Sequence, residues 1–115
     1  SPFINGDGEQ SRDFTFVENA VQANIKALFS KKEVKGQIVN IACGGRVTIN
    51  ELFNSIRDIV GNDVNPIYRG DRPGDVKDSL ANISLAKELI GYNPEFGIDD
   101  GLKITIDWFR KEFVN

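Results

Sequence analysis

QIVNIACGGRVTINELFNSIRDIV, residues 37–60, is the stretch that decides the fold class. Its first seven residues are mostly apolar and rich in β-branched side chains, and Asn40 is the only polar residue inside them. That composition is typical of a strand covered on both faces, as in a parallel sheet. A glycine pair and a helical pattern follow, so a strand leading into a helix is expected.

The helical part of this stretch has clear start and stop signals. Thr48 and Glu51 have the spacing of a capping box, and Val47 and Leu52 can form the hydrophobic staple beside it. Gly61 follows as a left-handed C-terminal residue. One apolar stripe lies between these signals and predicts the buried face of the helix: Ile49, Leu52, Phe53, Ile56, Ile59 and Val60.

Upstream of this stretch, residues 3–11 are glycine-rich and polar, which predicts a loop. RDFTF (12–16) alternates apolar and polar residues and predicts a short strand. A helix is expected from about Glu18, because four apolar residues recur at steps of four, four and three: Val17, Val21, Ile25 and Leu28.

Downstream, NPIYRG (65–70) predicts another short strand. SLAKELI (84–90) predicts a helix that is capped by Ser84 and ended by Gly91. A last helix is expected from about Asp99 to Phe113. Strands therefore alternate with helices, which is the α/β pattern, with four helices and only a few short strands.

Composition restricts the classes of function. The chain has 115 residues, the size of one domain, and a formal net charge of −3, which disfavours a nucleic-acid partner. No apolar run is long enough to cross a membrane, so a cytoplasmic location is expected. Cys43 is the only cysteine and there is no histidine, so neither a disulfide nor a zinc site is expected.

The sequence also suggests an incomplete unit. It contains no methionine, and its helices offer more apolar surface than its short strands can cover. We therefore expect residues 1–115 to be one region of a larger protein. We also expect the uncovered helix faces to make the chain associate with itself.

One loop concentrates charged residues. RGDRPGDVKDS (69–79) holds two arginines, three aspartates and a lysine around a Pro–Gly turn. Arg72 and Arg12 could hold a diphosphate, because a guanidinium matches phosphate oxygens, and Asp75 could accept hydrogen bonds from ribose hydroxyls. Phe14, two residues after Arg12, could pack on a ribose or base. The competing interpretation is a surface loop whose arginines and aspartates pair with one another.

Three blocks of the sequence resemble a known family. They are GDGEQSRDFTFVENAVQA (6–23), GQIVNIACGG (36–45) and RPGDVKDSLANISLAKELIGYNP (72–94). Together they are similar to the C-terminal third of extended short-chain dehydrogenase/reductase enzymes, above all the UDP-glucose and UDP-N-acetylglucosamine 4-epimerases. The resemblance implies a fragment of an extended Rossmann-type fold that carries the nucleotide-sugar-binding region, without the N-terminal NAD-binding region.

The same resemblance implies roles for five residues. Arg12 and Arg72 would bind the diphosphate of a UDP-sugar, Asp75 the ribose, and Phe14 the nucleotide. Ser79 matches a position near the sugar ring, where a small side chain leaves room for a 2-acetamido group.

The resemblance also implies what these residues do not supply. The family binds NAD through a glycine-rich turn and uses a Tyr-x-x-x-Lys pair. Here Tyr68 is followed four residues later by Arg72, and Tyr92 by Phe96. No catalytic residue and no NAD binding are therefore expected of residues 1–115, and NAD would belong to the intact parent enzyme. A nucleotide-sugar dehydratase or reductase, and a non-catalytic binding or assembly module, remain alternatives.

Overall fold

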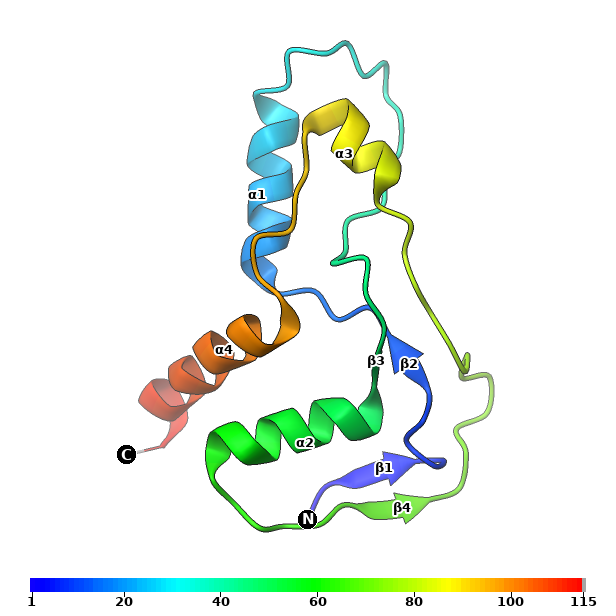
Figure 1. The fold of residues 1–115 in the computed structure, drawn as a ribbon, viewed down its shortest axis with the longest axis vertical. Coiled ribbons are helices and arrows are strands. Elements are labelled where there is room, and N and C mark those ends of the chain that lie inside the picture. Colours follow the sequence, from blue (N-terminus) through cyan, green and yellow to red (C-terminus); the bar gives the residue numbers. More distant parts are fainter. Residues whose placement is uncertain (115) are drawn as a thin grey trace.

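The computed structural model describes residues 1–114. Its elements in chain order are β1 (Phe3–Asn5), β2 (Ser11–Arg12), α1 (Val17–Leu28), β3 (Val47–Thr48), α2 (Ile49–Val60), β4 (Ile67–Arg69), α3 (Ser84–Ile90) and α4 (Ile98–Phe113). Helices α1 and α3 lie side by side at one end of the molecule, and α2 lies with β1 and β4 at the other (Figure 1). Four helices with few short strands confirm the predicted α/β class.

The helix boundaries follow the local signals. The Thr48 side chain accepts a hydrogen bond from the Glu51 N–H, and the Glu51 carboxylate accepts one from the Thr48 N–H, so the predicted capping box of α2 is confirmed. Gly61 ends α2 and Gly91 ends α3, both with left-handed backbone. The predicted cap of α3 is wrong in detail, because Ser84 is already helical and its N–H donates to the side-chain oxygen Oδ1 of Asn82.

The strand predictions are corrected in three places. Residues 3–5 form β1, which pairs in parallel with β4, although a loop was expected there. Only Ser11–Arg12 of the RDFTF region is a strand, paired antiparallel with β3. Residues 37–43 form no strand, because no other strand among residues 1–114 lies against their backbone. Ile38 in that segment is 90% exposed.

The buried core is small and lies between α1 and α3. It consists of Ala23, Ala42, Ile83, Ala86 and Tyr92. The Tyr92 hydroxyl donates a 2.6 Å hydrogen bond to the Ala42 carbonyl, which ties residues 37–43 to the chain after α3. Alanine side chains at three of these positions let the backbones approach closely.

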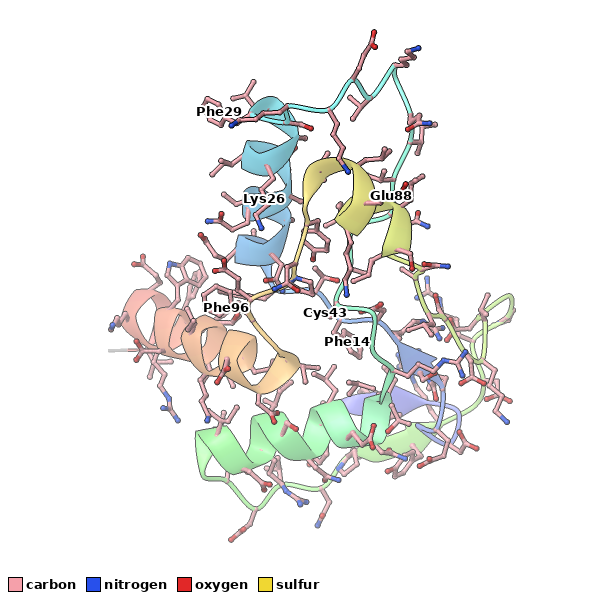
Figure 2. The ribbon with its side chains drawn as sticks, turned by 45° about the horizontal axis from the view of Figure 1, so that its top comes forward. Phe14, Lys26, Phe29, Cys43, Glu88 and Phe96 are labelled. Carbon is pink, nitrogen blue, oxygen red and sulfur yellow. The ribbon has the colours of Figure 1, made fainter. Side chains whose placement is uncertain are left out.

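Polar contacts fix α3 against α1. Lys32 Nζ donates to the Glu88 carbonyl at 2.7 Å, and Lys26 Nζ donates to the Gly91 carbonyl at 3.0 Å. Lys26 and Glu88 lie in this region in Figure 2. Lys26 of α1 and Lys32 of the segment after it thus bind carbonyl groups at the negative C-terminal end of α3.

Asn19 links α1 to the segment before α4. Its side chain is 1% exposed. The Asn19 Nδ2 donates to the Phe96 carbonyl at 2.8 Å, and Oδ1 accepts from the N–H groups of Glu95 and Phe96, both at 3.1 Å. Every polar atom of the side chain is used, so this buried amide is fully satisfied.

Helix α4 approaches the chain closely at a glycine. A Cβ added to Gly101 would stand 2.7 Å from the Cβ of Phe16, closer than carbon atoms pack. The Phe16 ring meets the Phe96 ring edge-on at 5.2 Å between centroids. Gly101 therefore lets α4 pack directly on the segment that follows β2.

The described chain is open rather than compact. Its radius of gyration is 16.8 Å, whereas a compact domain of this length has about 13 Å. It exposes 8093 Å² for a mass of 12.8 kDa, whereas a compact monomer of that mass exposes about 6,300 Å². The apolar stripe of α1 is exposed, with Val17 at 66% and Leu28 at 77%. The expected surplus of uncovered helix surface is confirmed.

Candidate functional site

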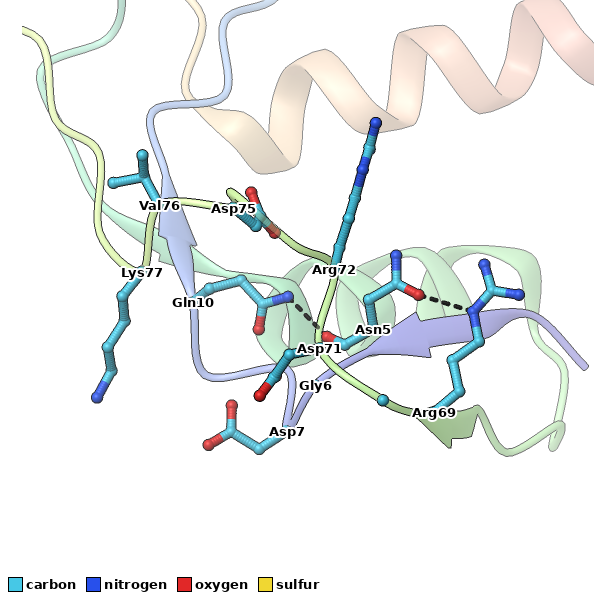
Figure 3. Close-up of a pocket in the computed structure, with 11 residues that line it drawn as sticks. Asn5, Gly6, Asp7, Gln10, Arg69, Asp71, Arg72, Asp75, Val76 and Lys77 are labelled. Carbon is cyan, nitrogen blue, oxygen red and sulfur yellow. Dashed lines mark hydrogen bonds between the residues drawn. The ribbon is translucent and has the colours of Figure 1, made fainter.

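The charged loop lies beside a cavity at the β1–β4 end of the molecule (Figure 3). The cavity has a volume of about 630 Å³. Its lining includes three cationic and three acidic side chains, namely Arg69, Arg72, Lys77, Asp7, Asp71 and Asp75. Such a mixed lining can bind an anion and accept hydrogen bonds from hydroxyls at the same time.

The loop is held at both ends by backbone hydrogen bonds. At its start, the Gly6 N–H donates to the Arg69 carbonyl at 2.8 Å. At its end, the Ser11 N–H donates to the Lys77 carbonyl at 2.8 Å, and the Ser79 N–H donates to the Ser11 carbonyl at 3.1 Å. Residues 70–76 between these anchors project from the fold, and their side chains are exposed.

Two glycines shape the loop and its floor. Gly74 has a φ of 79°, and the Asp75 N–H donates to the Arg72 carbonyl at 3.2 Å, which closes a turn. Gly6 has a φ of 71°, and a Cβ there would stand 2.4 Å from an Asp71 oxygen. A side chain at Gly6 would be strained and would displace Asp71.

Arg12 and Asp75, both predicted site residues, contact each other. Arg12 Nη2 lies 2.6 Å from Asp75 Oδ1, with the side chains 26% and 38% exposed. Arg12 Nη1 donates to the carbonyls of Ser11 at 2.6 Å and Lys77 at 3.2 Å. The residues predicted to bind phosphate and ribose are thus brought together. The alternative prediction, that the arginines and aspartates of the loop pair with one another, is not borne out within residues 1–114, because Asp75 pairs with Arg12 of β2 and not with Arg69 or Arg72.

Arg72 differs from the other arginine of the loop. Within residues 1–114 it has no ion pair or side-chain hydrogen bond, and Figure 3 shows it pointing away from Asp71. Arg69 Nε instead donates to Asn5 Oδ1 at 2.7 Å, and its guanidinium lies 4.8 Å from the centre of the Phe3 ring. Arg72 is therefore the arginine of this loop that is available to an anion.

Phe14 and Ser79 lie outside the cavity lining. Phe14 lines a separate apolar hollow of about 410 Å³, with Leu52 and Leu102. Ser79 is fixed through its backbone N–H to Ser11, and its side chain is exposed. Of the five predicted residues, Arg72 and Asp75 line the cavity, and Arg12 lies outside the lining but contacts Asp75.

Three residues that support the site were not predicted from the sequence, namely Ser11, Asp13 and Asp78. Ser11 is buried, and its Oγ donates to Asp78 Oδ1 at 2.8 Å. The two carboxylate oxygens of Asp13 accept from the N–H groups of Cys43 at 3.0 Å and Gly44 at 2.9 Å. These hydrogen bonds join segments far apart in the sequence, so no local sequence pattern predicts them.

Cys43 and Tyr92 lie near Asp13 and have raised pKa values. Burial is the larger cause for the Cys43 thiol, and the neighbouring Asp13 carboxylate raises its pKa further. Burial also raises the pKa of the Tyr92 hydroxyl, with smaller contributions from Cys43 and Asp13. Both groups stay protonated at neutral pH, which fits the predicted packing role of Cys43 and gives no activated nucleophile.

The glycines of residues 1–114 do not form the strand-to-helix turn that is typical of dinucleotide-binding folds. Gly6 and Gly8 lie between two strands, and Gly44 and Gly45 precede the two-residue strand β3, so no glycine-rich turn joins a strand directly to a helix N-terminus. No three potential metal ligands cluster in this part of the chain. None of the described helices has the length and apolar character needed to span a bilayer.

Comparisons with known proteins agree on one family. Residues 1–42 match the NAD dependent epimerase/dehydratase family. A putative UDP-glucose 4-epimerase of Methanocaldococcus jannaschii is 38% identical over 96% of this chain and 34% of its own length. The chain therefore spans about a third of this relative.

Two solved structures show the same arrangement. UDP-glucose 4-epimerase of Thermotoga maritima, whose structure was determined with UDP-glucose, is 37% identical to this chain and superposes with a TM-score of 0.89. The match covers 96% of this chain and 35% of the Thermotoga protein. UDP-N-acetylglucosamine 4-epimerase of Methanobrevibacter ruminantium, determined with UDP-N-acetylmuramic acid, is 40% identical with a TM-score of 0.88 over 98% and 36%. The chain therefore resembles part of an extended short-chain dehydrogenase/reductase of the NAD dependent epimerase/dehydratase family, similar to UDP-sugar 4-epimerases.

Proposed function

We propose that this chain supplies the nucleotide-sugar-binding part of an NAD-dependent UDP-sugar 4-epimerase. The substrates would be UDP-N-acetylglucosamine and UDP-N-acetylgalactosamine, or UDP-glucose and UDP-galactose. The observation that carries the proposal is that Asp75 pairs with Arg12 of β2 on the same loop that presents Arg72 without an ion pair within residues 1–114, in a chain similar to epimerases solved with UDP-sugars.

Each residue of the site has a proposed task. Arg72 and Arg12 bind the diphosphate, because their planar guanidinium groups match phosphate oxygens. Asp75 accepts hydrogen bonds from the ribose. Phe14 contacts the nucleotide from the apolar hollow that it lines, so the ligand would extend beyond the cavity beside the loop. Ser79 leaves space for a 2-acetamido group on the sugar.

NAD would be bound by a separate N-terminal region, which residues 1–115 meet through α1 and residues 37–43. Two observations support this division. The excess exposed surface of about 1,800 Å² is the size of a substantial interface. The apolar segment 37–43 has no partner strand within residues 1–114, and it packs against the buried face of α1 through Ala42 and Ala23, while the opposite stripe of α1 is exposed. A strand there could extend a neighbouring sheet while α1 covers its face.

The second candidate is a nucleotide-sugar dehydratase or reductase with the same binding site, since the matching family includes dehydratases. The full-length protein is incubated with NAD and each UDP-sugar, and the products are identified by NMR. A C4 epimer supports the epimerase, and loss of water to a keto-deoxy sugar supports the dehydratase. Binding without turnover leaves the non-catalytic binding module.

Binding itself is tested by calorimetry on the full-length protein. The ligands are UDP, UDP-glucose and UDP-N-acetylglucosamine, for the wild type and Arg72→Ala. Losing a charged partner of the diphosphate should cost about 2–5 kcal/mol, or at least about 30-fold in affinity. Arg57→Ala is the matched control, because it removes the same charge from α2, where Arg57 stacks on Phe53. Equal affinities of wild type and Arg72→Ala for every ligand would exclude the assigned site.

A further inference from the structure

The loop of residues 70–76 has one side-chain tether. Its two ends are fixed by backbone hydrogen bonds through Arg69 and Lys77. Between these ends, the hydrogen bonds and ion pairs found within residues 1–114 are the internal turn from Asp75 to Arg72 and the pair between Asp75 and Arg12. Among these interactions, the Arg12–Asp75 ion pair is thus the one in which a side chain of the loop binds to β2, two residues before the anchor at Lys77.

Arg12 does not depend on Asp75 for its orientation. Its Nη1 already donates to two carbonyl oxygens, one on Ser11 and one on Lys77. What Asp75 adds is a negative charge 2.6 Å from Nη2, which neutralises the guanidinium and occupies a donor on its accessible side. A phosphate oxygen approaching Arg12 would seek that same donor.

We infer that the Arg12–Asp75 ion pair is a latch that a diphosphate opens. This inference rests on the proposed function. In the absence of ligand, Asp75 neutralises Arg12 and keeps the loop against β2. A diphosphate group takes over the Arg12 donor, and Asp75 is released with the loop that also carries Arg72.

The energetics favour exchange of the partner. Both side chains are partly exposed, at 26% and 38%, so water and ligand reach them. Ion pairs with such exposure contribute little to stability. A diphosphate carries more negative charge than one carboxylate, so it can displace Asp75 from Arg12. The released carboxylate is then free to accept from the ribose, its proposed role.

Pyrophosphate is the probe that isolates the latch, because it has the diphosphate and lacks the ribose. We measure its affinity by calorimetry at low ionic strength on the full-length protein. Asp75→Asn removes the competing charge and should bind pyrophosphate about two- to five-fold more tightly than the wild type, the range expected for a partly exposed pair. Adding Arg12→Gln to Asp75→Asn should abolish the gain.

Asp71→Asn is the matched control, since it removes the same charge from the same loop and Asp71 forms no ion pair with Arg12. It should change the affinity less than Asp75→Asn. If Asp75→Asn binds pyrophosphate no more tightly than Asp71→Asn does, the latch is overturned and the proposed function still stands. A wild type that binds neither pyrophosphate nor UDP would overturn both.

Discussion

Replacing Asn19 should detach the segment before α4 from α1. Asn19→Ala removes the partners of three backbone groups, namely the N–H groups of Glu95 and Phe96 and the Phe96 carbonyl. Each such hydrogen bond contributes about 1 kcal/mol, and alanine recovers about 0.5 kcal/mol in helix propensity. The net loss should therefore be about 2–3 kcal/mol.

The expected loss is local, so hydrogen exchange measured by mass spectrometry is the suitable assay. In Asn19→Ala, a peptide that covers residues 92–98 should lose protection at two amides. Asn24→Ala is the matched control on the same helix, because the Asn24 side chain is exposed and donates only to the Ala20 carbonyl. If residues 92–98 are equally protected from exchange in Asn19→Ala and Asn24→Ala, Asn19 does not hold this segment against α1.

Asn19→Asp sharpens the same test. An ionised carboxylate can accept from the two N–H groups, but it repels the Phe96 carbonyl, whereas the protonated acid can donate to that oxygen. Burial raises the pKa of the introduced carboxyl above its unfolded value. The variant should therefore be closest to the wild type at acidic pH and lose stability as the pH rises through that raised pKa.

Two further outcomes are expected. Gly101→Ala should lower the melting temperature, because the new Cβ would stand 2.7 Å from Phe16 Cβ, and overpacking costs about 1–3 kcal/mol against a helix-propensity gain of about 1 kcal/mol. Gly45→Ala is the control, because a Cβ at Gly45 meets no atom within 4 Å. Equal melting temperatures of the two variants would contradict the close packing at Gly101. Residues 1–115 expressed alone should self-associate through the exposed α1 stripe, and Val21→Lys with Ile25→Lys should reduce this. Light scattering and binding of an apolar dye measure it, and a monodisperse wild-type monomer that binds no dye would contradict it.

The helices were predictable because their signals are local. The capping box of Thr48 and the glycine after α2 lie within a few residues of what they control. Strands depend on partners that the local pattern does not reveal. The segment 37–43 has the composition of a buried strand, yet no strand among residues 1–114 pairs with it. β1 escaped prediction because its partner, β4, lies more than sixty residues away.

The candidate site was predictable in residue type but not in contacts. Arginine, aspartate and a Pro–Gly turn indicated an anion-binding loop, and Arg12, Arg72 and Asp75 do lie at that loop. Which charged residues of the loop are paired could not be predicted. Asp75 pairs at 2.6 Å with Arg12, which lies 63 positions away in the sequence. The support from Ser11 and Asp13 depends equally on long-range folding.

The parallel pairing of β1 with β4 sets a limit on how this region can be dissected. The family match includes residues 1–5, but the three sequence motifs begin at Gly6, so a truncation designed from those motifs alone would discard Phe3–Asn5. That cut would leave β4 without its neighbour and remove Asn5, which orients Arg69 at the start of the charged loop. The smallest unit that can be transplanted into another protein with its loop intact must therefore include the residues before the first recognisable motif.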